Sequence, residues 1–209
     1  VVDALRGAMF GFRDEKKPLA SFLFAGPSGV GKTALAKLLA TALHRDERAL
    51  IKFDMSEFAE SHSVSKLLGS PAGYVGYRER NRFTEELKKR PYAVILFDEF
   101  DKAHPDVQKL LFQILDEGEL SDSLGKKIFF RHAIIIMTTN VGADVYSKTG
   151  LGFGRADIAP AGSKISHVPG MVMMALKDRF SAPLLGRISA VCAFSPLTKD
   201  HIRDIIALR

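Results

Sequence analysis

The sequence predicts an α/β fold in which parallel strands alternate with helices. Apolar runs such as residues 92–97 and 133–137 are typical of buried parallel strands, which are covered on both faces. Other segments carry apolar residues three and four positions apart, the spacing of a helix that buries one side. A glycine-rich segment, residues 26–31, lies between an apolar run and a helical segment. This order of strand, loop and helix is the one expected in a doubly wound α/β fold.

Composition limits the possible classes of protein. The 209 residues are 46% hydrophobic, enough for a sizeable core in one domain or in one large domain with an appendage. No apolar run approaches the roughly 20 residues that span a bilayer, and residues 1–6 lack the layout of a signal peptide. Cys192 is the single cysteine, so we expect no internal disulfide. Taken together, these observations favour a reducing, cytoplasmic location with no membrane partner.

The net charge of +6 permits two interpretations. It could mark a nucleic-acid surface, or it could attract an anionic nucleotide. The basic residues are scattered rather than grouped in blocks, which favours an ordinary solvated surface over a nucleic-acid interface.

Five apolar runs are predicted to form the strands. The third of them is nearly continuous, and the fourth ends in a polar triplet. The predicted strands are residues 21–25, 49–54, 92–97, 133–140 and 191–194.

Six segments are predicted to be helical. The clearest is 105–117, where a proline opens the first turn and Gly118 follows the last. Residues 119–130 indicate a hairpin or protruding loop, 142–170 a long functional or partly disordered loop, and 183–187 a helix break. The predicted helices are residues 1–12, 34–43, 84–90, 105–117, 171–180 and 198–209.

Together with the two residues after it, the glycine-rich segment fits the phosphate-binding pattern G-x-x-x-x-G-K-[ST], known as Walker A. Its glycines let successive backbone N–H groups point inward, and the following helix start adds partial positive charge. Lys32 would reach the terminal phosphates of a nucleotide, and Thr33 is placed to ligate Mg²⁺. The alternative is a glycine-rich turn before an ordinary helix. The residues that match the pattern are Gly26, Pro27, Ser28, Gly29, Val30, Gly31, Lys32 and Thr33.

Two acids follow the apolar run 92–97, which matches the Walker B pattern. Because ligands bind at the carboxyl ends of parallel strands, we expect Asp98 to meet the Walker A loop and hold Mg²⁺. Glu99 would polarise the attacking water. The two acids could instead cap a helix. Asn140, which ends another strand, should lie at the same edge of the sheet.

Four further stretches make the pattern more specific. One of them places aromatic residues among glycines, an arrangement that leaves apolar side chains on a loop. These stretches are Asp54-Met55-Ser56-Glu57-Phe58, Gly73-Tyr74-Val75-Gly76-Tyr77, Lys102-Ala103-His104-Pro105-Asp106-Val107 and Thr138-Thr139-Asn140.

Together with both Walker motifs, these stretches resemble the AAA+ ATPases over nearly the whole chain, specifically the second ATPase module of the double-ring Clp protein unfoldases. The resemblance implies a five-stranded parallel sheet flanked by helices and a homohexameric ring. It also implies that hydrolysis of ATP with Mg²⁺ threads an unfolded polypeptide substrate through a central pore. Residues 1–209 would form the large α/β subdomain of such a module, without its C-terminal small helical subdomain.

By motif match, the resemblance assigns roles to individual residues. Tyr74, with Val75, would grip substrate in the pore, Asn140 would orient the attacking water, and Arg187 would be an arginine finger for the neighbouring subunit's nucleotide. The sequence departs from the family at Gly186 and Ser189, where Asn and Asp are usual, so a structural role for Arg187 stays open. It also departs at Arg80-Asn81, where the family usually has two glycines.

A tripeptide after Asn140 bears on the partner. In protease-associated Clp proteins an aliphatic-Gly-aromatic tripeptide at this place docks onto the peptidase, so Leu151, Gly152 and Phe153 could bind a peptidase of the ClpP type. They could equally fold back onto the domain. Function alternatives are a disaggregase or secretion-linked remodeller without peptidase, a nucleic-acid-acting AAA+ ATPase, and an idle ATP-binding scaffold, against which the intact Lys32 and Glu99 argue.

Overall fold

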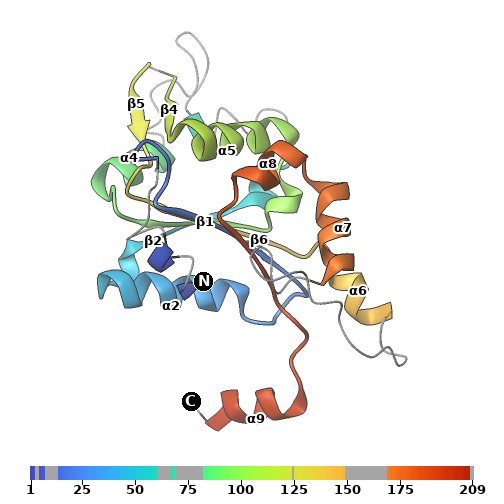
Figure 1. Cartoon of the computed structure of the whole chain (residues 1–209). Helices are drawn as coiled ribbons and strands as arrows, with labels where there is room; N and C mark the ends of the chain where they lie inside the picture. Colours follow the sequence, from blue (N-terminus) through green and yellow to red (C-terminus); the bar gives the residue numbers. More distant parts are fainter. Residues whose placement is uncertain are drawn as a thin grey trace.

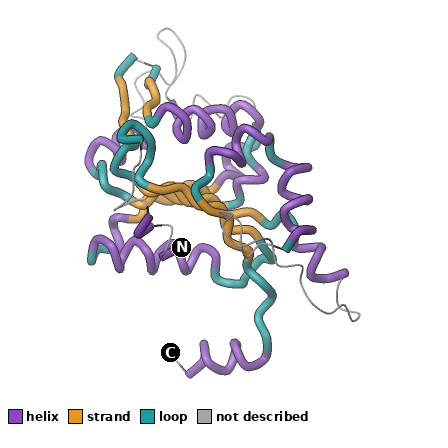
Figure 2. Tube along the Cα trace, in the orientation of Figure 1, coloured by secondary structure: helices purple, strands orange, loops and turns teal. Residues whose placement is uncertain are grey.

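A computed structural model describes residues 1–2, 5–7, 14–60, 67–68, 82–123, 125–148 and 169–207 of the chain. Within these ranges a central sheet is covered by helices on both faces (Figures 1 and 2). No helix in them is both long enough and apolar enough to cross a membrane.

The central sheet has five strands, and all recorded pairings between neighbours are parallel. The predicted five-stranded parallel sheet is therefore confirmed. The strand order is β2-β3-β6-β1-β7, so β1 lies between two strands that come much later in the chain. The strands are β1 (Ala20–Ala25), β2 (Leu50–Asp54), β3 (Val94–Asp98), β6 (Ile134–Thr139) and β7 (Ala190–Ala193).

Side chains that alternate along the strands build two apolar layers. On one face, Phe22 and Phe24 of β1 pack with Ala36 and Ala40 of α2 (Lys32–His44). The small side chains of these alanines let α2 lie close to the bulky residues of β1.

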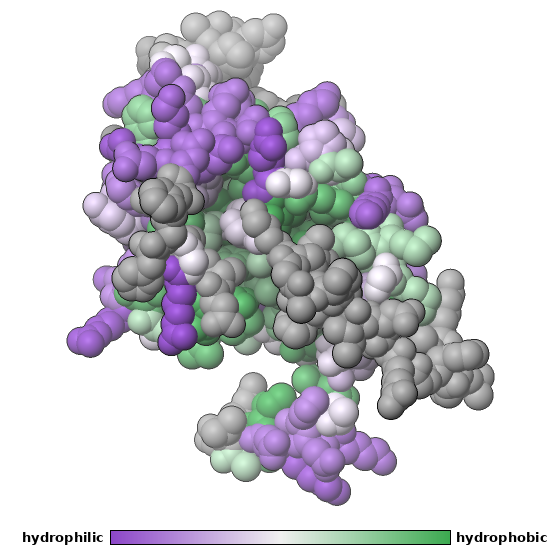
Figure 3. All heavy atoms as spheres, in the orientation of Figure 1, coloured by the Kyte–Doolittle hydropathy of each residue, from purple (hydrophilic) through white to green (hydrophobic). Residues whose placement is uncertain are grey.

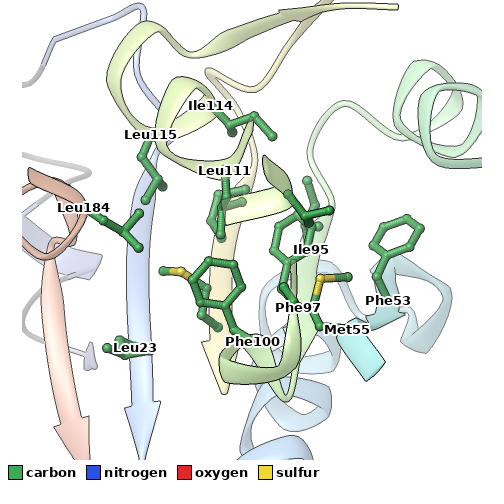
Figure 4. Packing of buried hydrophobic residues seen from close by; sticks show 14 of the residues in the cluster. Leu23, Phe53, Met55, Ile95, Phe97, Phe100, Leu111, Ile114, Leu115 and Leu184 are labelled. Atoms are coloured by element: carbon green, nitrogen blue, oxygen red, sulfur yellow. The ribbon is translucent and has the colours of Figure 1, made fainter. Parts of the chain in front are cut away.

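The opposite face forms the larger apolar cluster. Leu23 of β1 and Ile95 and Phe97 of β3 belong to this cluster, together with Leu111 and Leu115 of α5 (Pro105–Glu117) (Figure 4). The helices α7 (Gly170–Arg179) and α8 (Ala182–Arg187) complete this layer. Figure 1 shows α2 on one side of the sheet and α5 and α8 on the other, the arrangement expected of a doubly wound fold.

Smaller elements complete the described part of the fold. The predicted hairpin is present as β4 (Glu119–Ser121) and β5 (Lys127–Phe129), which pair antiparallel. The remaining elements are α4 (Arg82–Lys89), α6 (Ala143–Lys148), α9 (Lys199–Ala207) and the 3₁₀ turns η1 (Glu47–Ala49), η2 (Met55–Phe58) and η3 (Phe100–Lys102).

Two helices differ from the sequence prediction. Residues 183–187 were predicted to break a helix but lie in α8, because Pro183 falls in the first helical turn, where its missing N–H costs nothing. Buried Leu184 anchors this short helix to the core. The predicted loop 142–170 begins with helix α6, which the weak apolar periodicity of these residues did not indicate.

The helix α9 lies apart from the main body (Figure 1). None of its residues is buried, and Ile202, Ile205 and Ile206 are among the exposed large hydrophobic residues. Figure 3 shows apolar and polar surface side by side on this separate helix.

Candidate functional site

The Walker A loop has a backbone that only glycines adopt easily. Gly26, Gly29 and Gly31 have φ values of 148°, 75° and 99°. A side chain at Gly26 would meet the carbonyl oxygen of Phe194 at 2.2 Å, so the space also requires glycine. Gly31 is the N-cap of α2, which places the helix start directly after the loop.

Lys32 holds this loop together. Its Nζ donates hydrogen bonds to the carbonyl oxygens of Gly26 and Pro27, both at 2.6 Å. It donates a third to Oδ1 of Asn140 at 2.9 Å. Burial lowers the pKa of Lys32, although nearby carboxylates, that of Asp98 foremost, oppose this shift.

Asp98 lies at the end of β3 with three partners. The hydroxyl of Thr33 lies 3.1 Å from its Oδ1, the hydroxyl of Thr138 donates to Oδ1 at 2.5 Å, and Lys52 Nζ lies 2.6 Å from its Oδ2. Burial alone would raise the pKa of Asp98, but the hydrogen bonds from these partners, that of Lys52 foremost, outweigh burial and lower it. The carboxylate is therefore charged at neutral pH.

Glu99 has an unusual backbone and a lysine partner. Its φ of 55° lies in the left-handed region, and its N–H donates to the Thr138 hydroxyl at 2.9 Å. Its carboxylate accepts from Lys102 Nζ at 2.5 Å. The carboxylate predicted to polarise the attacking water is therefore held in an ion pair with Lys102.

Asn140 follows β6 and lies at the same end of the sheet as Asp98, where it was expected. The residues from the Walker A loop, β3 and β6 together line a hollow of ≈ 310 Å³ that includes Asp98, Glu99, Thr138 and Asn140. Thr33 and Asp98 offer hydroxyl and carboxylate oxygens, the donors that Mg²⁺ prefers, within 3.2 Å of each other. The arrangement fits a magnesium-bound polyphosphate.

Arg187 lies near the amino ends of the parallel strands, whereas the candidate site lies at their carboxyl ends. Its carbonyl oxygen accepts from the hydroxyl of Ser21, at the start of β1, whereas the Walker A loop follows the end of β1. Its guanidinium forms an ion pair with Asp116 at 2.5 Å and lies over the Phe112 ring. The structure therefore does not bring Arg187 to the site formed by its own chain.

The remaining predicted site residues lie outside the described residues. They are Tyr74 and Val75 of the predicted pore loop and Leu151, Gly152 and Phe153 of the tripeptide.

Sequence reasoning also missed several partners in the site. The contacts of Asp98 with Lys52 and Thr138 were not predicted, because these residues lie far apart along the chain. The one signal for them was the register of the parallel strands, which places the ends of β2, β3 and β6 side by side. The pair of Glu99 with Lys102 was also missed, although residues three positions apart can meet within one turn.

Comparison with known proteins agrees with this geometry. Residues 17–191 match the family model described as AAA domain (Cdc48 subfamily). The chain belongs to this AAA+ family. The AAA+ chain is 46% identical over 206 residues to an ATP-dependent Clp protease ATP-binding subunit ClpA homolog of Cyanidium caldarium, covering 98% of this chain and 24% of that one.

Two other relatives of this AAA+ chain widen the comparison. A probable chaperone protein ClpB 1 of Chlorobaculum tepidum is 46% identical, with 100% of this chain and 47% of the relative covered. A solved structure of Hsp104 with ATPyS and FITC casein has a TM-score of 0.84 and 40% identity, covering 99% of this chain and 34% of that one. The AAA+ chain thus spans about a quarter to a half of the length of these relatives.

Proposed function

We propose that this chain is the ATP-hydrolysing large α/β subdomain of a Clp-type chaperone. The observation that carries the proposal is the convergence of Lys32, Thr33, Asp98, Glu99 and Asn140 on one hollow at the carboxyl edge of the sheet. Phosphate-binding, magnesium-binding and water-activating groups are all present there, as ATP hydrolysis requires. Membership of the AAA+ family supports the same activity.

Each residue has a distinct role in the proposed reaction. The loop N–H groups and Lys32 bind the phosphates, and Lys32 exchanges its two carbonyl partners for phosphate oxygens. Glu99 leaves Lys102 to accept a proton from the attacking water, which Asn140 orients. Thr33 and Asp98 would hold Mg²⁺, which neutralises charge on the phosphates.

The substrate in this proposal is an unfolded polypeptide, threaded through a homohexameric ring by Tyr74 and Val75. Support comes from the relatives, which are named as Clp chaperones and Clp protease subunits, and from the Hsp104 structure with FITC casein. Arg187 fits the ring because it faces away from its own site and has a side chain that is 43% exposed.

The names of the relatives allow two fates for a threaded polypeptide: delivery to a peptidase, or release without proteolysis. The ClpA relative is named as an ATP-binding subunit of a Clp protease, which favours docking of a peptidase through Leu151, Gly152 and Phe153. The ClpB relative is named as a chaperone, and the Hsp104 structure is named with casein and without a protease. These names favour the alternative of a disaggregase or remodeller without a peptidase. Binding of a ClpP-type peptidase by the full-length protein separates the two.

Hydrolysis of ATP by the full-length protein, with and without casein, tests the proposal. We expect casein to stimulate the wild type, Glu99→Gln to bind ATP with at least about 100-fold slower turnover, and Tyr74→Ala to hydrolyse ATP without translocating casein. Stimulation by DNA instead of casein would contradict the substrate class. Turnover by Glu99→Gln at the wild-type rate would contradict the catalytic assignment.

A further inference from the structure

The turn after β6 is held by a carboxylate that the Walker motifs do not include. Asp101 lies in η3, directly after Glu99 and Phe100, and its Oδ1 accepts two hydrogen bonds. The hydroxyl of Thr139 donates at 2.7 Å, and the backbone N–H of Asn140 donates at 3.3 Å. The Thr139 hydroxyl in turn accepts from the N–H of Val141 at 3.1 Å. One carboxylate oxygen therefore connects the Walker B turn with the last residue of β6 and with Asn140, which follows it.

The η3 turn is itself anchored to the core. Phe100 is 1% exposed and stacks on Phe180, which follows α7, with ring centroids 5.5 Å apart. The guanidinium of Arg179 donates to the carbonyl oxygen of Asp101. These contacts fix the backbone of Asp101 from the side of α7, so its carboxylate is presented to β6 from a rigid support.

The anchored carboxylate of Asp101 bonds directly to the backbone of Asn140. The side-chain Oδ1 of Asn140 accepts from Lys32 Nζ, and its backbone N–H is held by Asp101. An amide at the end of a strand has two flexible torsions of its own, so the direction of the side chain depends on how firmly the backbone turn is held. The buried hydroxyl of Thr139 adds a second connection to the same oxygen.

We propose that Asp101 is a positioning residue for ATP hydrolysis, whose Oδ1 fixes the Thr139–Asn140 turn so that the Asn140 amide faces the attacking water. This inference rests on the proposed function. Asp101 acts through Asn140 and does not touch the nucleotide. Loss of the two bonds lets the amide swing away from the reacting atoms, and a displacement of about 1 Å is enough to slow an enzymatic step by up to roughly 100-fold.

Geometry and charge make opposite predictions for the same substitution. Asp101 also adds negative charge near Lys32. Asp101→Asn removes that charge but keeps an oxygen that can accept from Thr139 and Asn140. If positioning is the role, Asp101→Asn should behave like the wild type, and if charge is the role, it should behave like Asp101→Ala.

The test measures kcat, KM and ATP affinity in the full-length protein. For Asp101→Ala we expect kcat to fall at least about tenfold with ATP affinity within about threefold of wild type. Asp101→Asn should restore kcat to within about threefold of wild type. Asp106→Ala is the matched control, because Asp106 is an acid that pairs with Lys109 on α5 and makes no recorded contact with Asn140.

Thr139 provides an independent pair of variants if Asp101→Ala does not fold. Thr139→Ser keeps the hydroxyl, whereas Thr139→Val keeps the shape and loses the bond to Asp101, so kcat should fall in Thr139→Val alone. A wild-type kcat in Asp101→Ala or Thr139→Val overturns the positioning role and leaves the proposed function intact. Equal losses in Asp101→Ala and Asp101→Asn also overturn it. A wild type that binds ATP without hydrolysing it overturns both.

Discussion

The two Walker B acids are each paired with a lysine. Asp98 faces Lys52 of the neighbouring strand β2, and Glu99 faces Lys102 one turn later. Two adjacent carboxylates at one strand end repel each other, and these cations offset that repulsion. In the proposed reaction Glu99 must leave Lys102 before it can accept a proton, so breaking this pair adds to the free-energy cost of hydrolysis.

The Lys52–Asp98 pair gives stability a defined pH dependence. The folded state lowers the pKa of Asp98 below its ordinary 3.8, so the pair stabilises the fold above pH 3.8. That contribution is lost as the pH falls through the folded-state pKa. We expect Lys52→Met to lower the free energy of unfolding by about 1 kcal/mol at pH 7, because Lys52 is 41% exposed and its attraction is partly screened. Urea denaturation at pH 7 and pH 3 checks this.

Lys109→Met is the control for that substitution. Lys109 is 78% exposed, and its pairing with Asp106 on the surface of α5 should matter less. The gap between wild type and Lys52→Met should narrow at pH 3. A gap that stays constant from pH 7 to pH 3 would show that Lys52 acts through packing of its stem and not through Asp98.

At the scale of the elements, the sequence predicted the strands better than the short helices. All five strands were predicted within two residues of their bounds at either end, because buried parallel strands are continuous apolar runs. The helices α6 and α8 were missed, since six residues are too few to show a helical period and Pro183 and Gly186 resemble a break. Local propensity does not predict α8, and burial of Leu184 in the core stabilises this helix instead.

In the candidate site, too, some contacts could be predicted from the sequence and others could not. Lys32, Asp98 and Asn140 were predicted to meet because each follows or ends a strand of one parallel sheet. The contacts of Asp101 and Lys52 could not be predicted, since they depend on side-chain directions that vary within one turn or one strand.

The end of α5 depends on a glycine. Gly118 has φ of 68°, and a Cβ there would lie 1.7 Å from the carbonyl oxygen of Lys16. Gly118→Ala therefore combines backbone strain with a clash against main chain, which cannot rotate away. We expect a loss of at least about 2 kcal/mol in the free energy of unfolding, measured by urea denaturation.

Gly125→Ala is the matched control for Gly118→Ala. Gly125 has a similar φ of 73°, but nothing lies within 4 Å of an added Cβ. Only the backbone cost should remain, about 1 kcal/mol. Equal losses at the two positions would mean that the segment containing Lys16 moves aside and does not brace α5.

At the scale of the whole molecule, the candidate nucleotide site and Arg187 lie at opposite ends of the parallel strands. Lys32 and Asn140 lie beyond the carboxyl ends of β1 and β6, whereas the backbone of Arg187 is bonded to Ser21 at the start of β1. The length of β1 separates them by roughly 15 Å at about 3.3 Å per residue. An arginine so placed contributes to hydrolysis only if another subunit supplies the nucleotide.

Mixed assemblies of full-length subunits test this arrangement. Lys32→Ala subunits should lack a working site but keep Arg187, and Arg187→Ala subunits should keep the site but lack the arginine. Each variant alone should hydrolyse ATP at least about 100-fold more slowly than wild type. A random 1:1 mixture should recover about a quarter of wild-type turnover, the share of interfaces in a closed ring that pair an intact site with an intact arginine.

The mixture decides between a catalytic and a structural Arg187. The ion pair with Asp116 and the contact with Phe112 offer a structural role within one chain, and loss of such a role cannot be repaired by a neighbour. If mixed rings form, as shown by subunits carrying two different affinity tags, and turnover does not rise above that of either variant, Arg187 acts within its own subunit. Recovery in the mixture requires that one chain's arginine serves the next chain's site, because neither variant alone holds both.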